Sequence, residues 1–218
     1  MARQLKGKPI TYFIIDAGWY AEKGKGWESN MGDWNVSPEL FPSGLESIVQ
    51  QIRSCGMIPG IWFELENCGP LAEAYTWERH LLQRDGIPIT SGQRRFWNFR
   101  DPFVIEYLSE KVIDFIKKYD FGYLKVDYNE TIGIGCDGAE SLGEGLRLQM
   151  EAVQNFFRRI RREIPHLVEI RIPTASGFQI GDVYSDDKTA FRITRDILSI
   201  RVKGNFIAAA VLLTSQPH

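Results

Sequence analysis

Apolar strands that end in polar residues alternate with amphipathic helices along this chain. Ile10 to Ile15, Met57 to Phe63 and Phe121 to Val126 are predicted to be strands, and acidic or amide residues follow each of them. Helices are predicted over residues 45–55 and from Pro102 to about Tyr119. This alternation is typical of a parallel α/β fold, because parallel strands need long crossover connections.

The positions of the polar residues favour one parallel fold over another. No glycine-rich nucleotide-binding loop follows the first predicted strand, which argues against a doubly wound nucleotide-binding fold. A (β/α)8 TIM barrel collects its active site at the carboxyl ends of several strands. Six polar residues lie at or just past such ends: Asp16, Glu64, Glu66, Asn98, Asp127 and Asn129. We therefore expect a TIM barrel, incomplete at roughly five to six strands because a full one usually needs about 250 residues.

Composition excludes several classes of protein. The 218 residues are 44% hydrophobic with a net charge of -2, so nothing indicates binding to nucleic acid or to a membrane surface. The three cysteines and three histidines are scattered without metal-ligand spacing, so no metal or other cofactor is expected. The odd cysteine count and the lack of an apolar core near Met1 favour a cytoplasmic location.

The most informative strand end is Lys125-Val126-Asp127. Residues two apart in a strand point to the same side, so Lys125 and Asp127 are expected to face one cavity. The lysine charge would keep Asp127 ionised, and an ionised carboxylate at the end of a buried strand can act as a nucleophile. The alternative is an ion pair that only stabilises the fold.

Five motifs occur in order along the chain: Ile14-Ile15-Asp16-Ala17-Gly18-Trp19-Tyr20, Gly32-Asp33-Trp34, Phe41-Pro42-Ser43-Gly44-Leu45, Gly60-Ile61-Trp62-Phe63-Glu64-Leu65-Glu66 and Leu124-Lys125-Val126-Asp127-Tyr128-Asn129. Together they resemble the catalytic domain of the α-galactosidases of glycoside hydrolase family 36, in clan D. The resemblance runs from about Lys8 to Glu169. It implies that residues 1–169 form the N-terminal and central part of a catalytic barrel, and that residues 170–218 are a poorly matching or altered continuation.

The resemblance implies roles for four residues. Asp127 corresponds to the nucleophile of a retaining mechanism, and Lys125 to a lysine that contacts sugar hydroxyls. Trp62 corresponds to a tryptophan that lines the galactose pocket, and Asp16 to an aspartate that holds galactose hydroxyls. The family usually has a second aspartate where this chain has Ala17, so galactose is expected to be preferred less strictly.

Other strand-end residues are weaker candidates. Trp19, Glu64 and Asn129 are expected to contact substrate, although tryptophan also fills barrel cores and Glu64 could instead join a polar network. The resemblance also implies an arginine that reaches the sugar, at Arg94 or Arg95, with a position at the surface as the alternative. The family has its acid/base in a Ser-Asp pair on a later strand, so the resemblance implies Asp186, in Tyr184-Ser185-Asp186-Asp187, as the acid/base candidate. The adjacent carboxylate would also favour a protonated acid. The same four residues also suit a solvated turn.

The expected function is that of a retaining exo-α-glycosidase that removes terminal α-galactosyl residues from a carbohydrate substrate. Two alternatives remain open. A transglycosylase of the raffinose or stachyose synthase type would transfer the sugar to another sugar instead of water. An inactive barrel fragment would keep the nucleophile strand without the acid and the closing strands.

Overall fold

The computed structural model describes residues 2–173, 192–194 and 197–199. The chain divides into two compact units, Met1–Ala175 and Ser176–His218. In the second unit β10 (Arg192–Thr194) pairs antiparallel with β11 (Ile197–Ser199). The boundary expected from the sequence, at residue 169, falls inside the last strand of the first unit. Asp186 lies outside the described residues, and all other candidate residues belong to the first unit.

A parallel sheet of four strands organises the first unit. Its order is β1-β2-β8-β9, formed by β1 (Tyr12–Ile15), β2 (Ile58–Phe63), β8 (Tyr123–Tyr128) and β9 (Val168–Pro173). Neighbouring strands are all parallel, and the register pairs Ile14 with Gly60 and Gly60 with Tyr123. The parallel α/β prediction is therefore confirmed, with four barrel strands in the part of the chain that is described.

Asn98, which the sequence places at or just past the end of a barrel strand, instead follows a strand of a separate antiparallel sheet. This strand is β7 (Arg94–Phe96), which pairs with β3 (Asn67–Cys68) and β6 (Thr90–Ser91). Gly92 and Gln93 both have positive φ, as a two-residue hairpin turn requires, so β6 and β7 pair locally. A second small hairpin joins β4 (Gln83–Arg84) to β5 (Ile87–Pro88).

The two helices predicted from the sequence, at residues 45–55 and from Pro102, begin at the predicted positions. Asp101 caps α3 (Pro102–Leu108) by accepting a hydrogen bond from the Phe103 amide at 2.9 Å, and Ser141 caps α5 (Leu142–Glu163). A π-helical turn, η4 (Ser109–Asp114), joins α3 to α4 (Phe115–Tyr119). The described residues also form η1 (Ala2–Leu5), α1 (Trp27–Asn30), α2 (Leu45–Ser54), η2 (Glu73–Thr76) and η3 (Glu78–His80).

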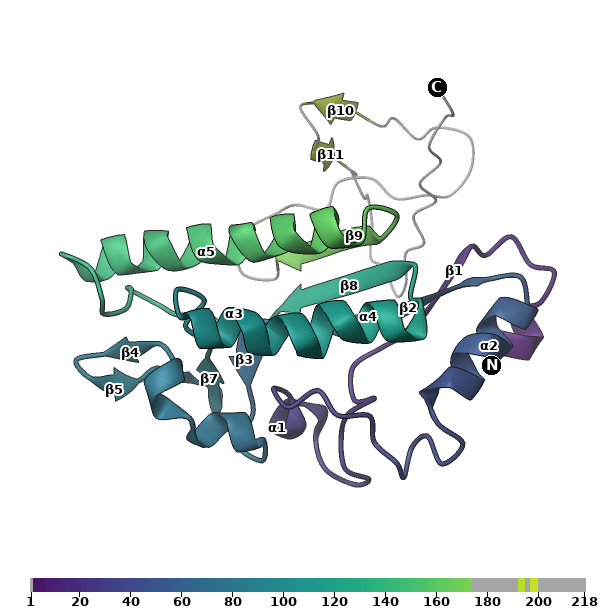
Figure 1. Cartoon of the computed structure of the whole chain (residues 1–218), viewed down its shortest axis with the longest axis horizontal. Helices are drawn as coiled ribbons and strands as arrows, with labels where there is room; N and C mark the ends of the chain where they lie inside the picture. The colour runs from purple at the N-terminus through teal and green to yellow at the C-terminus, as the bar shows by residue number, and fades with distance from the viewer. Residues whose placement is uncertain (1, 174–191, 195–196, 200–218) are drawn as a thin grey trace, which may run out of the picture. The chain divides into compact units, whose positions relative to one another are not determined.

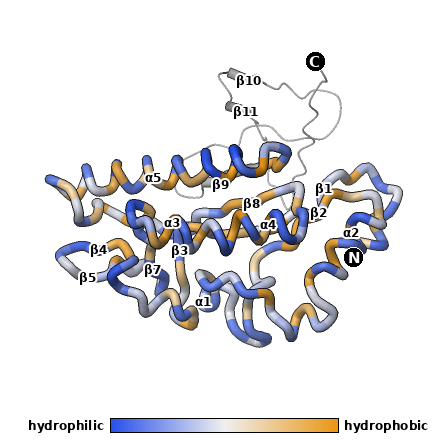
Figure 2. Tube along the Cα trace, viewed as in Figure 1, coloured by the Kyte–Doolittle hydropathy of each residue, from blue (hydrophilic) through white to orange (hydrophobic). Residues whose placement is uncertain are grey.

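The helices cover one face of the parallel sheet, where the core lies. α5 and the α3–α4 run lie along β8 and β9 (Figure 1), and hydrophobic residues recur along α5 between hydrophilic ones (Figure 2). Four residues of β2 and β8 on this covered face are at most 1% exposed: Ile61, Phe63, Leu124 and Val126. Burial of these side chains against the helices is the main force that holds the strands in register.

The opposite face of the sheet is only partly covered. Ile58 is 37% exposed there, and Tyr12, Ile14 and Tyr123 are of intermediate burial. In a closed barrel this face would point into the interior.

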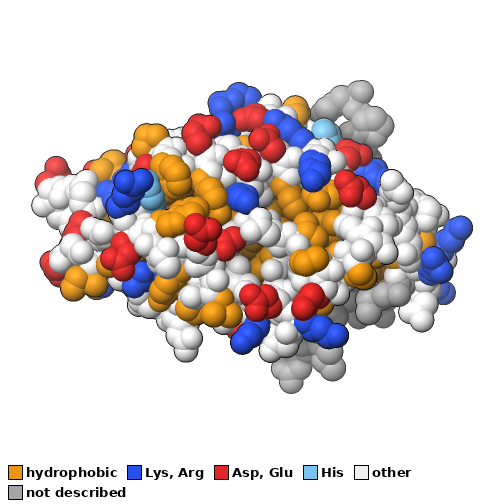
Figure 3. All heavy atoms as spheres, turned by 60° about the horizontal axis from the view of Figure 1, so that its bottom comes forward, with side chains coloured by type: hydrophobic (Ala, Val, Ile, Leu, Met, Phe, Trp, Pro, Cys, Tyr) orange, Lys and Arg blue, Asp and Glu red, His pale blue; other side chains and the backbone are white. Residues whose placement is uncertain are grey.

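On the surface in Figure 3, lysine and arginine side chains are interspersed with acidic ones. Among the described residues, no helix combines the length and apolar character that crossing a membrane demands.

Candidate functional site

Three neighbouring strands bring candidate residues to one edge of the sheet. Asp16 directly follows β1, Glu64 directly follows β2, and Asp127 lies near the end of β8. Trp62 pairs in register with Lys125, and side chains of paired residues in a parallel sheet point to the same face. The carboxyl ends of β1, β2 and β8 therefore form one candidate active site.

Lys125 makes an ion pair across the sheet with Asp16. Its Nζ lies 2.9 Å from Asp16 Oδ2 and 3.1 Å from Oδ1, and the two side chains are 25% and 60% exposed. The sequence led us to expect the lysine to pair with Asp127, two residues away on the same strand. The structure instead pairs Lys125 with Asp16, because Asp16 follows the strand on the far side of β2. This pair links the first and third strands of the sheet at a solvent-accessible position.

Asp127 is half-buried and has one hydrogen-bonded oxygen. The indole N–H of Trp62 donates to Asp127 Oδ2 at 3.3 Å, and the Trp62 ring itself is only 1% exposed. Asp127 Oδ1 has no hydrogen-bond partner among the described residues. A carboxylate that is oriented through one oxygen and open at the other can approach an electrophilic carbon.

Glu64 is the centre of a buried polar network. Its carboxylate is fully buried and accepts hydrogen bonds from Arg94 Nη1 at 3.0 Å and from the backbone N and Nδ2 of Asn129 at 3.2 and 2.9 Å. Burial raises the pKa of Glu64, while the donors from Asn129 and Arg94 act in the opposite direction. The structure thus places Glu64 behind the exposed Asn129, where it orients that side chain instead of contacting solvent.

Arg94 is a functional candidate that the sequence did not single out from its neighbour. Successive side chains of β7 point to opposite faces, so Arg94 reaches Glu64 while Arg95 turns to Glu78 and the Tyr75 carbonyl. The Arg94 guanidinium also lies 5.0 Å from the centre of the Trp27 ring. Strand alternation was the signal that could have separated the two arginines, but it needs the register of β7.

Trp19 lies in the core and not at the site. It is 2% exposed, its Nε1 donates to the Trp62 carbonyl at 2.8 Å, and its ring packs against Trp34, Phe63 and Phe115. The expected substrate contact is therefore corrected to a supporting role beneath Trp62. Trp27 is the half-buried tryptophan beside the site, meeting the Trp62 ring edge-on at 5.4 Å.

The loop after β8 is held by the small hairpins. Glu130 accepts a hydrogen bond from Ser91 Oγ at 2.6 Å, and Arg84 donates to the carbonyls of Ile132 and Gly135. Asp137 accepts from the backbone amides of residues 85 and 86 in the β4–β5 turn. These contacts fix the loop that begins at Asn129, so the antiparallel hairpins support the candidate site from one side.

No group of acidic, histidine and cysteine side chains in the described ranges is arranged to hold a metal ion.

Ala17 follows Asp16 directly, and its amide donates to Asp16 Oδ1 at 2.9 Å. The aspartate that would lie beside Asp16 in the resemblance stated above is thus replaced by a methyl group at the same strand end.

Comparison with known proteins places this geometry in a family. The melibiase family model matches residues 1–178. Alpha-galactosidase C of Emericella nidulans is 28% identical over 144 residues, covering 61% of this chain and 19% of that protein. The alpha-galactosidase of Escherichia coli is 26% identical over 187 residues, covering 83% of this chain and 25% of that protein. The chain thus spans about a quarter or less of these relatives.

Solved structures share the fold. The GH36 alpha-galactosidase AgaA A355E of Geobacillus stearothermophilus, in complex with 1-deoxygalactonojirimycin, has a TM-score of 0.70 at 22% identity over 79% of this chain and 24% of that one. The alpha-galactosidase of Lactobacillus brevis has a TM-score of 0.67 at 23% identity, with the same coverage. The four parallel strands are therefore part of a (β/α)8 TIM barrel, and the chain belongs to the melibiase family, as a partial catalytic domain of the family 36 α-galactosidase type.

Proposed function

We propose that this chain carries the nucleophile half of a retaining α-galactosidase, which removes terminal α-galactosyl residues from oligosaccharides or other glycosides. The observation that carries the proposal is Asp127, half-buried at the end of β8, with Oδ2 held by Trp62. The relatives that the chain matches are α-galactosidases, and complexes of similar structures contain 1-deoxygalactonojirimycin, raffinose and stachyose.

The proposed reaction proceeds in two displacements. The Asp127 carboxylate attacks the anomeric carbon, the bond from that carbon to the leaving oxygen breaks, and a second carboxylic acid gives its proton to that oxygen. Water then attacks the anomeric carbon, the ester to Asp127 breaks, and the second carboxylate takes up the proton of the water. Asp186 is our candidate for the second group, and it lies outside the described residues.

Substrate contacts are assigned by exposure. Asp16 and Lys125 are both accessible to solvent, and their ion pair can exchange for hydrogen bonds to sugar hydroxyls. Asn129 is exposed and oriented by Glu64, so it presents an amide to the same space. Trp62 contributes chiefly by orienting Asp127, since so little of its surface is accessible.

A trapping experiment tests the proposal. The full chain is incubated with an activated fluorinated α-galactosyl inactivator, and its intact mass is measured before and after peptide mapping. We expect one added glycosyl group, mapped to Asp127 and absent from Asp127→Asn. A label on another carboxylate would refute the assignment. A chain that folds but takes up no label and hydrolyses no aryl α-galactoside would support the inactive fragment instead.

A further inference from the structure

A pocket lies in the long connection between β2 and β8, among residues 76–103. It has a volume of about 430 Å³ and is lined by residues from η2, η3 and the start of α3: Thr76, Trp77, Glu78, Arg79, His80 and Phe103. This volume is within the range of small-molecule sites. None of these six residues is one of the candidate site residues Asp16, Trp62, Glu64, Lys125, Asp127 and Asn129, so the pocket has a lining of its own.

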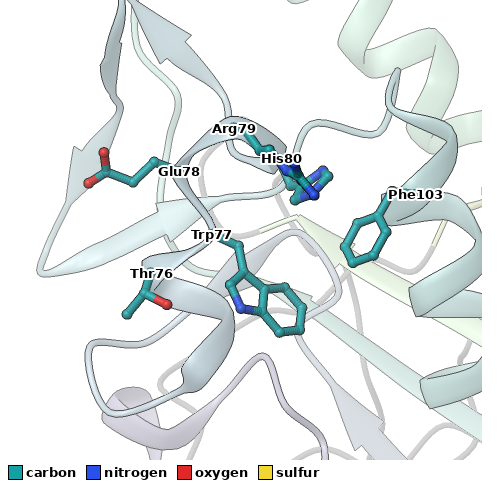
Figure 4. Close-up of a pocket in the computed structure, with 6 residues that line it drawn as sticks. All are labelled: Thr76, Trp77, Glu78, Arg79, His80 and Phe103. Carbon is teal, nitrogen blue, oxygen red and sulfur yellow. The ribbon is translucent and has the colours of Figure 1, made fainter.

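Aromatic rings form the walls of the pocket. The Phe103 ring stacks on the His80 ring with centroids 4.0 Å apart, and the Trp77 ring meets Phe103 edge-on at 5.8 Å. The side chains of Trp77, His80 and Phe103 face a common space, whereas Glu78 points away from it (Figure 4). Phe103 is 42% exposed and Trp77 is half-buried, so flat apolar surface remains accessible to a ligand.

A hydrogen-bond chain holds these rings rigidly. Arg79 Nε donates to His80 Nε2 at 2.7 Å, so the histidine proton is on Nδ1, which donates to Asp101 at 2.7 Å. Asp101 also caps α3 through the amide of Phe103, so one carboxylate fixes both the imidazole and the ring stacked on it. The pocket is therefore formed before any ligand binds, which reduces the entropy lost on binding.

The polar groups at the rim define the class of ligand. The terminal nitrogens of Arg79 make no hydrogen bond with the described residues, so they remain available as donors. The Thr76 hydroxyl donates to the Glu73 carbonyl and leaves its oxygen as an acceptor. Asp101, which is joined to Arg79 through the His80 ring, balances the charge of Arg79, so the pocket does not select an ion. Apolar aromatic surface beside hydrogen-bonding groups that carry no net charge matches a pyranose ring, which has C–H faces and a hydroxyl edge.

We propose that this pocket is a second saccharide-binding site, in which a sugar ring lies against Trp77 and Phe103 and accepts hydrogen bonds from Arg79. The proposal rests on the saccharide substrate class of the proposed function, but it requires no catalysis. A chain with both sites could hold one part of a branched galactoside while the candidate active site engages another part.

Native affinity electrophoresis with a soluble galactomannan in the gel tests the second site. The full chain is expected to be retarded, and Trp77→Ala or Phe103→Ala to weaken the apparent affinity by about two- to tenfold each. Phe103→Leu keeps apolar volume but removes the flat face, so it should weaken binding as well. The matched control is Ile134→Ala, which removes an apolar side chain that is 73% exposed and lies outside the pocket. Circular dichroism confirms that each variant is folded.

Lys125→Met separates the two sites. Retardation that persists in Lys125→Met and falls when Phe103→Ala is added supports the second site, even if no hydrolysis is ever detected. Retardation abolished by Lys125→Met and unaffected by the pocket variants would overturn it, as would a full chain that migrates freely. A Phe103→Leu variant with unchanged binding would also overturn it, since it would indicate an apolar contact that needs no sugar-stacking ring.

Discussion

Two ion pairs at adjacent strand ends differ in burial, and this difference separates their roles. The Asp16–Lys125 pair has side chains 60% and 25% exposed, whereas the Glu64–Arg94 pair has side chains 0% and 7% exposed. An exposed pair is worth little to stability and can exchange its partner for a sugar at low cost. A buried pair strongly destabilises the fold when one partner is removed, so it suits a fixed scaffold.

Asp127 is the third carboxylate at this edge and pairs directly with neither cation. Its hydrogen-bond donor is the neutral indole of Trp62, which orients the carboxylate without forming an ion pair. The arrangement thus combines a scaffold carboxylate, an exchangeable carboxylate and a carboxylate open at one oxygen. Variants at each position should separate stability from binding and from chemistry.

The largest effect is expected from Asp127→Asn. The amide keeps the shape and the contact with Trp62 but cannot form the ester, so hydrolysis of an aryl α-galactoside should fall by about 10⁴–10⁶-fold. The free energy of unfolding should change little, which urea denaturation of the same samples would check. Hydrolysis at the rate of the parent chain would show that Asp127 is not the nucleophile.

Glu64→Ala should have the largest effect on stability. It leaves the Arg94 guanidinium buried without its carboxylate, so the free energy of unfolding should fall by about 3–5 kcal/mol. The matched variant Asp16→Ala, at the exposed pair, should cost about 0–1 kcal/mol. Urea denaturation of both variants measures the contrast, and equal losses would mean that burial does not distinguish the two pairs.

Local sequence patterns predicted that Asp16, Glu64 and Lys125 belong to the site, but not which residue each of them would pair with. Strand alternation places Lys125 and Asp127 on one face, and the Asp101-Pro102 pair marks the start of α3 correctly, because both are short-range effects. The partner of Lys125 is 109 residues away, and only the order of the strands brings Asp16 beside it. Strand pairing over such separations has no local signature, so the sequence suggested the nearest carboxylate instead.

The same limit explains the other differences. Phe96 and Trp97 have high strand propensity, but propensity does not determine which sheet a strand joins. β7 pairs with β6 in a local hairpin instead of joining the parallel sheet. Trp19 follows a barrel strand as a sugar-contacting residue could, yet its ring turns into the core. Glu64 was recognised as a polar network candidate, whereas the role of Arg94 required the face of β7 to be known.

The selectivity for galactose should depend on Ala17. Ala17→Asp would restore a carboxylate beside Asp16, and a charge-assisted hydrogen bond to the sugar is worth about 1.5–3 kcal/mol. The ratio of activity on aryl α-galactoside to that on aryl α-glucoside should therefore rise by about one to two decades. Ala17→Asn has a similar size without the charge and serves as the control. An unchanged ratio in Ala17→Asp would remove Ala17 as a determinant of selectivity.

The smallest expected effect is the pH dependence of the buried pair. Burial raises the pKa of Glu64 in the folded state, whereas the pKa of the same carboxyl in the unfolded chain should be about 4.3. The folded state then binds the proton more tightly than the unfolded state. The resulting stabilisation is complete below the unfolded pKa and is lost as the pH rises through the higher folded pKa.

Glu64→Gln isolates this dependence because the amide cannot titrate. The free energy of unfolding of the parent chain, minus that of Glu64→Gln, should decrease as the pH rises from about 4.3 towards neutrality. Urea denaturation of both proteins across this range measures the difference. A difference that grows with pH would mean that the donors from Arg94 and Asn129 outweigh burial. The folded pKa of Glu64 would then be lowered, and the buried pair would stabilise the fold chiefly through its ionised form.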